Sequence, residues 1–347
     1  MAAPRAQPEA DCSDDSSQDW SIVSTVPDKY GFFGQEHVQT NHPPVPREVV
    51  LSREKKWLRM LSNWDYFMQE KHSKLRKRCR KGIPHSLRPR AWQFLCGAQA
   101  LQDKHKVLYQ SLTEQPGDPK CLDDIKKDLH RQFPQHEMFC SENGVGQQEL
   151  FLVLKAFSVL DPEVGYCQAQ APLAAFLLMH MPTEQAFWCL VSVCHKYLNG
   201  YYSHGMQQIQ IDGDILFGLL KKVAPQVYRH LKRQKIEPVL YMTEWFLCAY
   251  TRTLPWSTVL RVWDMFLFEG VKVLFKVGLV LLKGSLQPRL KRCPTMYETL
   301  EAIRQPPPGL LEEEALVQHM LRLKLTEEDF QKEHSRQVAK RQKRLQH

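Results

Sequence analysis

An arginine stands three residues after an aspartate in the stretch DIKKDLHRQFP, residues 124–134. Apolar residues recur there at steps of four, from Ile125 to Phe133, and the proline that follows stops a helix. Asp128 and Arg131 therefore share one face at the end of a predicted helix and can form an ion pair. Such a pair is either an ordinary surface contact, which contributes about 0.3–0.5 kcal/mol, or a means of aiming a positive charge at an anionic group.

A glutamine in the segment PEVGYCQAQAP is the second candidate for chemistry. Gln168 follows Tyr166 and precedes the apolar stretch PLAAFLLMHM, which predicts a buried helix. The side-chain amide both donates and accepts hydrogen bonds, so it can orient a water molecule. The same amide could equally tie the loop to the main chain in front of the helix.

Arg88 and Trp92 form the third polar pattern, within KGIPHSLRPRAW. Their spacing of four puts them on one helical face, where a cation–π or packing pair is the ordinary interpretation. We expect Trp92 to lie in the core. None of the three patterns identifies a function alone.

The elements that must position these residues are predicted to be helices. From about residue 84 to about residue 286, apolar residues recur at steps of three and four, as in TEQAFWCLVSVCHKYLNG and STVLRVWDMFLFEG. Alternating strand patterns are few, and no internal repeat is present. The sequence therefore predicts an all-α fold of many short helices arranged in two lobes.

Composition divides the chain into four parts. Residues 1–50 are rich in Pro, Ser, Asp and Gln and are predicted to be disordered, apart from the short apolar run DKYGFFG. Residues 51–80 predict an amphipathic lead-in helix with a basic run, and residues 81–290 the compact domain. Residues 291–347 are expected to form a linker and a basic helical tail.

Composition and charge argue against several classes of protein. No apolar run reaches the roughly 18–20 residues of a membrane span, and ten cysteines occur without CxxC spacing, so we expect a soluble cytosolic protein without a zinc site. The net charge of +9 is concentrated in residues 71–82 and 331–347, which contain no aromatic residues suited to base stacking. Nucleic-acid binding is therefore not expected, whereas a solvated surface, an acidic partner or an anionic membrane is compatible with this charge.

Sequence patterns of nucleotide-binding loops and hydrolytic sites are missing. The chain contains no GxxxxGK[ST], no GxGxxG after a strand, no GxSxG and no HExxH. We therefore expect that the protein neither binds a nucleotide with a loop of its own nor hydrolyses an ester by itself.

The patterns RxxxW, IxxDxxR and YxQ, in this order between residues 88 and 168, resemble the signature of the TBC domain. That family consists of all-helical GTPase-activating proteins that act mainly on Rab GTPases. The resemblance continues through EWFLCAYTRTLP at 244–255 and RVWDMFLFEG at 261–270. Within the family, DLHRQFPQHEMF, YCQAQAP and TEWF are most similar to the subfamily that includes carabin. One departure is Ala169, where many members have glycine.

The resemblance implies a mechanism in which the chain supplies two fingers to a small GTPase. Arg131 would stabilise charge on the transferred phosphoryl group, and Gln168 would orient the attacking water. Four residues would support the fingers or contact the GTPase: Asp128 by restricting the arginine, Tyr166 by holding the loop, and Arg88 and Trp92 by bracing the site. GTP and Mg²⁺ would be bound by the partner, so no cofactor or metal of the chain's own is expected.

Three alternatives remain open. The chain could bind GTPases as an effector or scaffold without accelerating hydrolysis, or it could act on a Ras-type GTPase. Its basic segments could also make it chiefly a membrane- or nucleic-acid-binding adaptor. The last residues, RLQH, lack the apolar end that a PDZ ligand needs, so no PDZ partner is expected.

Overall fold

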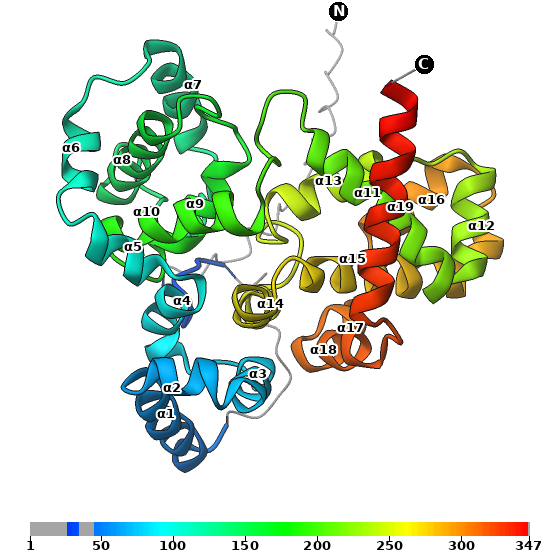
Figure 1. Ribbon diagram of the computed structural model, residues 1–347, viewed down its shortest axis with the longest axis horizontal. Helices are drawn as coiled ribbons and strands as arrows, with labels where there is room; N and C mark the ends of the chain where they lie inside the picture. The colour runs from blue at the N-terminus through cyan, green and yellow to red at the C-terminus, as the bar shows by residue number, and fades with distance from the viewer. Residues whose placement is uncertain (1–25, 35–44, 346–347) are drawn as a thin grey trace, which may run out of the picture.

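Figure 1 shows the computed structural model of the chain, which describes residues 26–34 and 45–345. Within these ranges the chain is helical, and its one pairing of extended segments is an isolated antiparallel bridge between Phe32 and His136. Two groups of helices lie side by side, with α14 (Trp256–Glu269) between them and viewed end-on (Figure 1). The predicted all-α, two-lobed fold is confirmed.

The first lobe contains α9 (Gln170–Leu178), in which every residue is buried. Its sequence QAPLAAFLL has no polar face, which is typical of a helix enclosed on all sides. Around it lie α4 (Arg88–Cys96), α5 (Ala98–Lys104), α6 (Leu108–Glu114), α7 (Pro119–Leu129), α8 (Val145–Leu160) and α10 (Thr183–Ser192), which continues as a π-helical turn, η2 (Val193–Tyr197). This lobe carries both loops that the sequence singles out.

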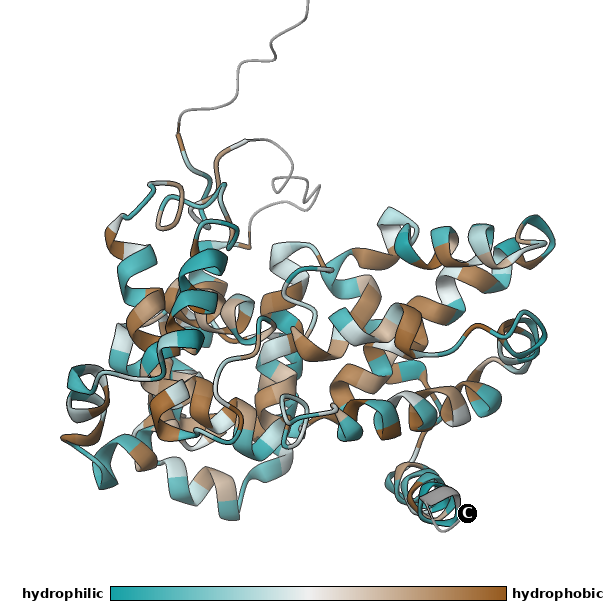
Figure 2. Cartoon of the chain, turned by 90° about the horizontal axis from the view of Figure 1, so that it is seen from above, coloured by the Kyte–Doolittle hydropathy of each residue, from teal (hydrophilic) through white to brown (hydrophobic). Residues whose placement is uncertain are grey.

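The second lobe is built on α11 (Gln207–Val223) and α15 (Lys272–Leu286), which pack against each other. Figure 2 shows apolar residues on the inward surfaces of these helices and polar residues outside. The lobe also contains α12 (Pro225–Arg233), α13 (Val239–Leu247), the 3₁₀ turn η3 (Gln287–Arg292) and the C-terminal helices α16 (Met296–Arg304), α17 (Pro308–Leu311), α18 (Glu313–Arg322) and α19 (Glu327–Leu345).

The C-terminal part of the chain, predicted as a linker and a basic helical tail, is helical and packs against the second lobe. Helix α19 lies along α11 and is viewed nearly end-on in Figure 2, beside the letter C. Lys222 of α11 pairs with Asp329 at 2.5 Å, and the Phe330 ring meets Phe275 of α15 at 5.8 Å between centroids. Residues 291–345 therefore belong to the second lobe.

The lead-in segment differs from the single helix predicted over residues 51–80. The helix is interrupted at Lys71, and before that at Ser62 and Asn63, whose side chains donate to main-chain carbonyls four residues earlier, at 3.0 and 3.1 Å. Such side chains compete with the helical hydrogen bonds of the main chain. The resulting helices are α1 (Arg47–Leu61), α2 (Trp64–Gln69) and α3 (His72–Lys81).

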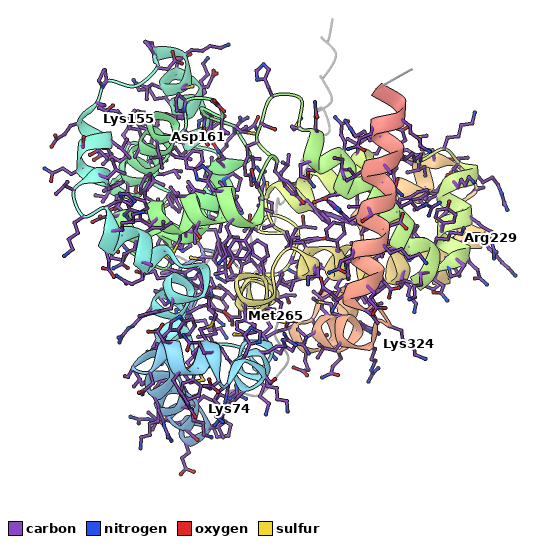
Figure 3. All side chains as sticks on the ribbon, in the orientation of Figure 1. Lys74, Lys155, Asp161, Arg229, Met265 and Lys324 are labelled. Atoms are coloured by element: carbon purple, nitrogen blue, oxygen red, sulfur yellow. The ribbon has the colours of Figure 1, made fainter. Side chains whose placement is uncertain are left out.

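Helix α14 joins these parts, because it contacts α3, α4, α15 and α18. Met265, labelled in Figure 3, lies on it near the centre of the molecule. Glu269 accepts two hydrogen bonds from Arg80 of α3, both at 2.6 Å. Arg261 donates to the Arg80 carbonyl at 2.7 Å and to Glu313 of α18 at 2.5 Å. Charged groups on one buried helix thus anchor α3, from the N-terminal part of the chain, and α18, from the C-terminal part.

Parts of the predicted disorder and the prediction about a PDZ ligand concern residues 1–25, 35–44 and 346–347, which lie outside the described residues. Residues 26–34 include the apolar run DKYGFFG, which was excepted from the predicted disorder, and they pack against the domain. Helix α1 begins at Arg47, inside the segment predicted to be disordered. No helix in the described part of the chain combines the length and the apolar character needed to cross a bilayer.

Candidate functional site

The end of α7 fixes the first candidate pair. The helix is capped by Asp118, whose carboxylate accepts a hydrogen bond from the Cys121 N–H at 2.8 Å. At the other end, the side chain of Gln132 donates to the Asp128 carbonyl at 2.9 Å, which satisfies a carbonyl that the helix leaves without a partner. Both ends of the helix are therefore held by side chains, and Arg131 lies just beyond its C-terminal end.

Asp128 links the arginine to the second loop. It is only 5% exposed, and its Oδ1 atom accepts a hydrogen bond from Nη2 of Arg131 within an ion pair. Its Oδ2 atom accepts a hydrogen bond from the Tyr166 hydroxyl at 2.7 Å. Burial and this hydrogen bond raise the pKa of Tyr166, so the phenol remains a donor at neutral pH. The arginine side chain is 46% exposed, so a buried carboxylate holds an accessible guanidinium.

The two glutamines of YCQAQ have different surroundings. Gln170 is fully buried. Its side-chain oxygen accepts a hydrogen bond from the Cys167 N–H at 3.0 Å, and the main-chain N–H of Gln170 donates to the Cys167 carbonyl at 2.8 Å. Gln168 is exposed, and no residue in the described ranges hydrogen-bonds its side-chain amide. The loop is thus tethered by Gln170, while the amide of Gln168 faces solvent.

The loop that carries Gln168 turns at a glycine. Gly165 has a φ of +60°, a left-handed conformation that side chains disfavour, and a Cβ there would lie 3.2 Å from the sulfur of Cys121. Asp161, labelled in Figure 3, accepts a hydrogen bond from the Val164 N–H at 3.2 Å and supports the turn. Ala169 has φ −69° and ψ −14°, which alanine adopts freely, so no glycine is needed at that departure from the TBC pattern.

Arg88 and Trp92 meet at a carboxylate that the sequence patterns did not single out. Asp264 of α14 is fully buried and accepts hydrogen bonds from Arg88 at 3.0 and 3.1 Å, from Trp92 Nε1 at 2.8 Å and from the Ile83 N–H at 2.8 Å. These donors offset the free-energy cost of burying the charge. Arg88 and Trp92 thus do not form the expected cation–π or packing pair; both donate to the same carboxylate. The one sequence feature that indicated this acceptor was a single Asp within the apolar run RVWDMFLF.

Aromatic rings connect this brace to the arginine loop. Trp92 stacks on Phe176 with 5.5 Å between ring centroids, and Phe176 meets the edge of Trp256 at 5.3 Å. Trp256 in turn contacts Phe133, two residues after Arg131, at 5.8 Å. The brace therefore lies behind the loop and supports it through a continuous aromatic layer.

A cleft of about 260 Å³ opens beside Arg131. Phe133 and Trp256 form apolar walls, and Arg252 and Phe32 are also among the residues that line it. Sequence reasoning assigned neither of the last two to the site. Arg252 resembles any surface cation, and Phe32 stands in the short apolar run DKYGFFG, which the sequence sets apart from the segment predicted to be disordered but does not connect to the site.

Comparison with solved structures defines the class of the fold. The chain superposes on the Chlamydomonas flagellar RabGAP TBC domain with a TM-score of 0.63, over 85% of this chain and 98% of that one, at 25% sequence identity. The fold is therefore that of a helical TBC domain. The chain belongs to the Rab-GTPase-TBC domain family, which matches residues 85–290.

Relatives support the narrower grouping. The chain is 57% identical to TBC1 domain family member 10A of Mus musculus over 316 residues, which are 90% of this chain and 63% of that protein. It is 54% identical to TBC1 domain family member whacked of Drosophila melanogaster over 93% of this chain and 90% of that protein. It is 46% identical to mouse carabin over 92% of this chain and 72% of that protein, so the predicted similarity to the carabin subfamily is confirmed. The chain spans just under two thirds of the first relative's length.

Proposed function

We propose that this chain is a GTPase-activating protein for a Rab-type small GTPase, acting in the cytoplasm in vesicle trafficking. The observation that carries the proposal is the arrangement of Arg131, half exposed and held by the buried Asp128, with the exposed amide of Gln168 on a loop tied to the same carboxylate through Tyr166. Membership of the Rab-GTPase-TBC domain family supports the class of partner.

Arg131 would act on the charge that develops during phosphoryl transfer. Hydrolysis of GTP spreads negative charge over the transferred group and the leaving oxygen, and small GTPases alone lack part of the compensating charge. An arginine supplied in trans accelerates the reaction by about 10³–10⁵-fold, which corresponds to about 4–7 kcal/mol. Asp128 would reduce the rotamer freedom that the arginine loses on insertion.

Gln168 would orient the attacking water in place of the GTPase's own glutamine. A neutral amide can accept from the water while it donates to a second group, and so fix the direction of attack. Because the tether of this loop is Gln170, the Gln168 amide does not have to leave an internal partner before it enters the GTPase. GTP and Mg²⁺ would be held entirely by the GTPase.

The test is a panel of purified Rab-type and Ras-type GTPases loaded with GTP, with phosphate release followed after addition of the full chain. We expect acceleration of at least one Rab-type member, and a loss of about 100-fold or more in Arg131→Ala. Binding to GTP-loaded partners without acceleration would instead identify an effector or scaffold. Acceleration confined to Ras-type members would show that the substrate is a Ras-type and not a Rab-type GTPase. Full activity of a folded Arg131→Ala variant would refute the finger.

We also propose a peripheral contact with an anionic membrane, through residues 71–82 and 331–347. Helix α3 buries Leu75 and exposes the lysines around it, including Lys74, labelled in Figure 3, and Lys77. Near an anionic surface each such cation contributes about 1 kcal/mol. Co-sedimentation with vesicles should therefore depend on anionic lipid and weaken in Lys74→Glu/Lys77→Glu, and equal binding to neutral vesicles would contradict the proposal.

A further inference from the structure

Residues 28–33, which we call the N-terminal clasp, form a closed turn well before α1. The Asp28 carboxylate accepts hydrogen bonds from the N–H groups of Tyr30 at 2.8 Å and Phe32 at 3.0 Å, and the Asp28 N–H donates to the Phe32 carbonyl at 2.8 Å. Gly31 permits the turn, because its φ of +92° lies in the region that side chains disfavour. The clasp is therefore a defined element of its own.

The clasp is attached to the arginine loop, residues 131–137, through main-chain atoms. The Phe33 N–H donates to the Gln135 carbonyl at 2.8 Å. In the other direction, the Glu137 N–H donates to the Gly31 carbonyl, also at 2.8 Å. This pair of hydrogen bonds is that of an antiparallel ladder, so the clasp fixes the backbone of the loop.

His136 adds a third attachment. Its Nδ1 atom accepts a hydrogen bond from the Met138 N–H at 3.1 Å, so Nε2 carries the proton and donates to the Tyr30 carbonyl at 2.9 Å. Burial lowers the pKa of His136, which keeps this neutral form at pH 7. A Cβ at Gly31 would lie 2.6 Å from Nε2, so the contact leaves no room for a side chain there.

The ring of Phe32 fills the space under the loop. It is 2% exposed, and its centroid lies 4.8 Å from that of Trp256, 4.9 Å from His136 and 6.4 Å from Phe133. Phe133 has a φ of +44°, a strained value for a residue with a side chain, which persists only where the surroundings hold it. Phe32 and Trp256 enclose that residue, two positions after Arg131.

We propose that the N-terminal clasp is a positioning element of the catalytic site, in which Phe32 acts through the arginine loop on Arg131. Phe32 and Arg131 line the same cleft, although the clasp lies outside residues 85–290 that match the family. The inference rests on the proposed function, in which Arg131 is the finger. A loop without the clasp spreads the guanidinium over many positions, which lowers the fraction of complexes with reactive geometry. The effect therefore falls on kcat and not on binding of the GTPase.

The experiment compares Phe32→Ala with Phe330→Ala in the full chain. Phe330 is a phenylalanine of the second lobe, buried against Phe275, and reports the general effect of losing a buried ring. With a responsive GTPase, Phe32→Ala should lower kcat by about 10–100-fold with little change in KM, whereas Phe330→Ala should retain kcat per folded molecule. Phe32→Leu, which keeps apolar bulk, should recover most of the rate. Equal losses of kcat in the two alanine variants would overturn the proposal.

A double-mutant cycle separates positioning from general support. If Phe32 acts through Arg131, Phe32→Ala should cause no further loss in an Arg131→Ala background. The same fold-loss in both backgrounds overturns the proposal, as does a folded Phe32→Ala protein with the parent's kcat. Should Phe32→Ala not fold, Gly31→Ala disturbs the same attachment and should give the same selective loss; its absence overturns the proposal.

Amide exchange provides a readout that does not depend on activity. In Phe32→Ala, exchange across residues 131–137 should become faster, and in Phe330→Ala it should not. If amide exchange across residues 131–137 is unchanged in both variants, the proposal that the clasp positions this loop is overturned. The two proposals fail separately: full activity of Arg131→Ala removes the finger and with it the inference, whereas a loss in Arg131→Ala with normal clasp variants removes the inference alone.

Discussion

Replacing Asp128 by alanine should separate the placement of the arginine from its charge. Among the described residues, Asp128 is the hydrogen-bonding partner of the Arg131 guanidinium, and 46% of that side chain is otherwise exposed. Without the carboxylate the arginine regains rotamer freedom equivalent to about 1.5–2 kcal/mol. Because that freedom must be lost again in the transition state, we expect stimulated hydrolysis to slow by about 10–30-fold. Arg131→Ala should lose at least about 100-fold, since it removes the charge itself.

The same change has a separate effect on stability. Asp128→Ala leaves the largely buried hydroxyl of Tyr166 without its acceptor, which should lower the free energy of unfolding by about 1–3 kcal/mol. The double variant Asp128→Ala/Tyr166→Phe removes both partners and should regain most of that stability without regaining rate. Asp128→Asn keeps an acceptor oxygen for the phenol but has no charge, so its rate should be intermediate.

Two measurements decide the matter: single-turnover phosphate release with a responsive GTPase, and urea denaturation of each variant. A folded Asp128→Ala protein with the parent's rate would refute the view that the carboxylate places Arg131. A rate as low as that of Arg131→Ala would refute the separation of placement from charge. Recovery of rate in Asp128→Ala/Tyr166→Phe would show that stability, and not placement, had caused the loss.

Four further outcomes are expected. Arg131→Lys should lose about 100-fold or more in rate, because lysine lacks the planar fork of donors. Its Tm should be nearly unchanged, since lysine keeps a positive charge beside Asp128 and the side chain at position 131 is half exposed; a fast folded variant would contradict this. Trp92→Ala should cost about 3–5 kcal/mol in urea denaturation, and parent-like stability would place that residue outside the core. Stimulation of a GTPase whose own catalytic glutamine is alanine should persist and be lost in Gln168→Ala, whereas Gln170→Ala should mainly lower stability; the reverse pattern would exchange the two roles. Burial depresses the pKa of His180 well below its ordinary 6.5, so the unfolded chain binds a proton at a higher pH than the folded chain does. The stability that this histidine contributes is fully present above about pH 6.5 and should be lost as the pH falls toward the folded pKa. Melting curves that do not change between about pH 7 and pH 5 would contradict this.

The features that could be predicted depend on neighbours in the chain. Helical content follows from apolar spacing, and the pairing of Asp128 with Arg131 follows from a separation of three at a helix end. The break at Ser62 and Asn63 was missed because apolar spacing does not register where polar side chains hydrogen-bond to the main chain and end a helix. The finger roles of Arg131 and Gln168 stay predictions.

Contacts between distant segments could not be predicted from spacing. Tyr166 reaches Asp128 across 38 residues, and Arg88 reaches Asp264 across 176. One aspartate in an apolar run indicates that it must find donors, but not which donors. The role of Phe32 was missed for a related reason: the sequence sets the apolar run DKYGFFG apart from the polar stretch around it, but it does not show which distant residues that run contacts.

Helix α14 also determines when this chain can fold during synthesis. The bonds from Arg80 to Glu269 and from Arg88 to Asp264 close loops of 189 and 176 residues. Long loops lose entropy before their contacts form, so folds that depend on them are slow. At a translation rate of about 5–20 residues per second, α14 leaves the ribosome roughly 9–35 s after α4.

During that interval Trp92 lacks its acceptor, and the apolar surface that α14 later covers stays open to solvent. A nascent chain in this state is prone to aggregation and suits chaperone binding. The loop that carries Arg131 is therefore synthesised early, yet it acquires the support of Trp256 only after α14 has been added.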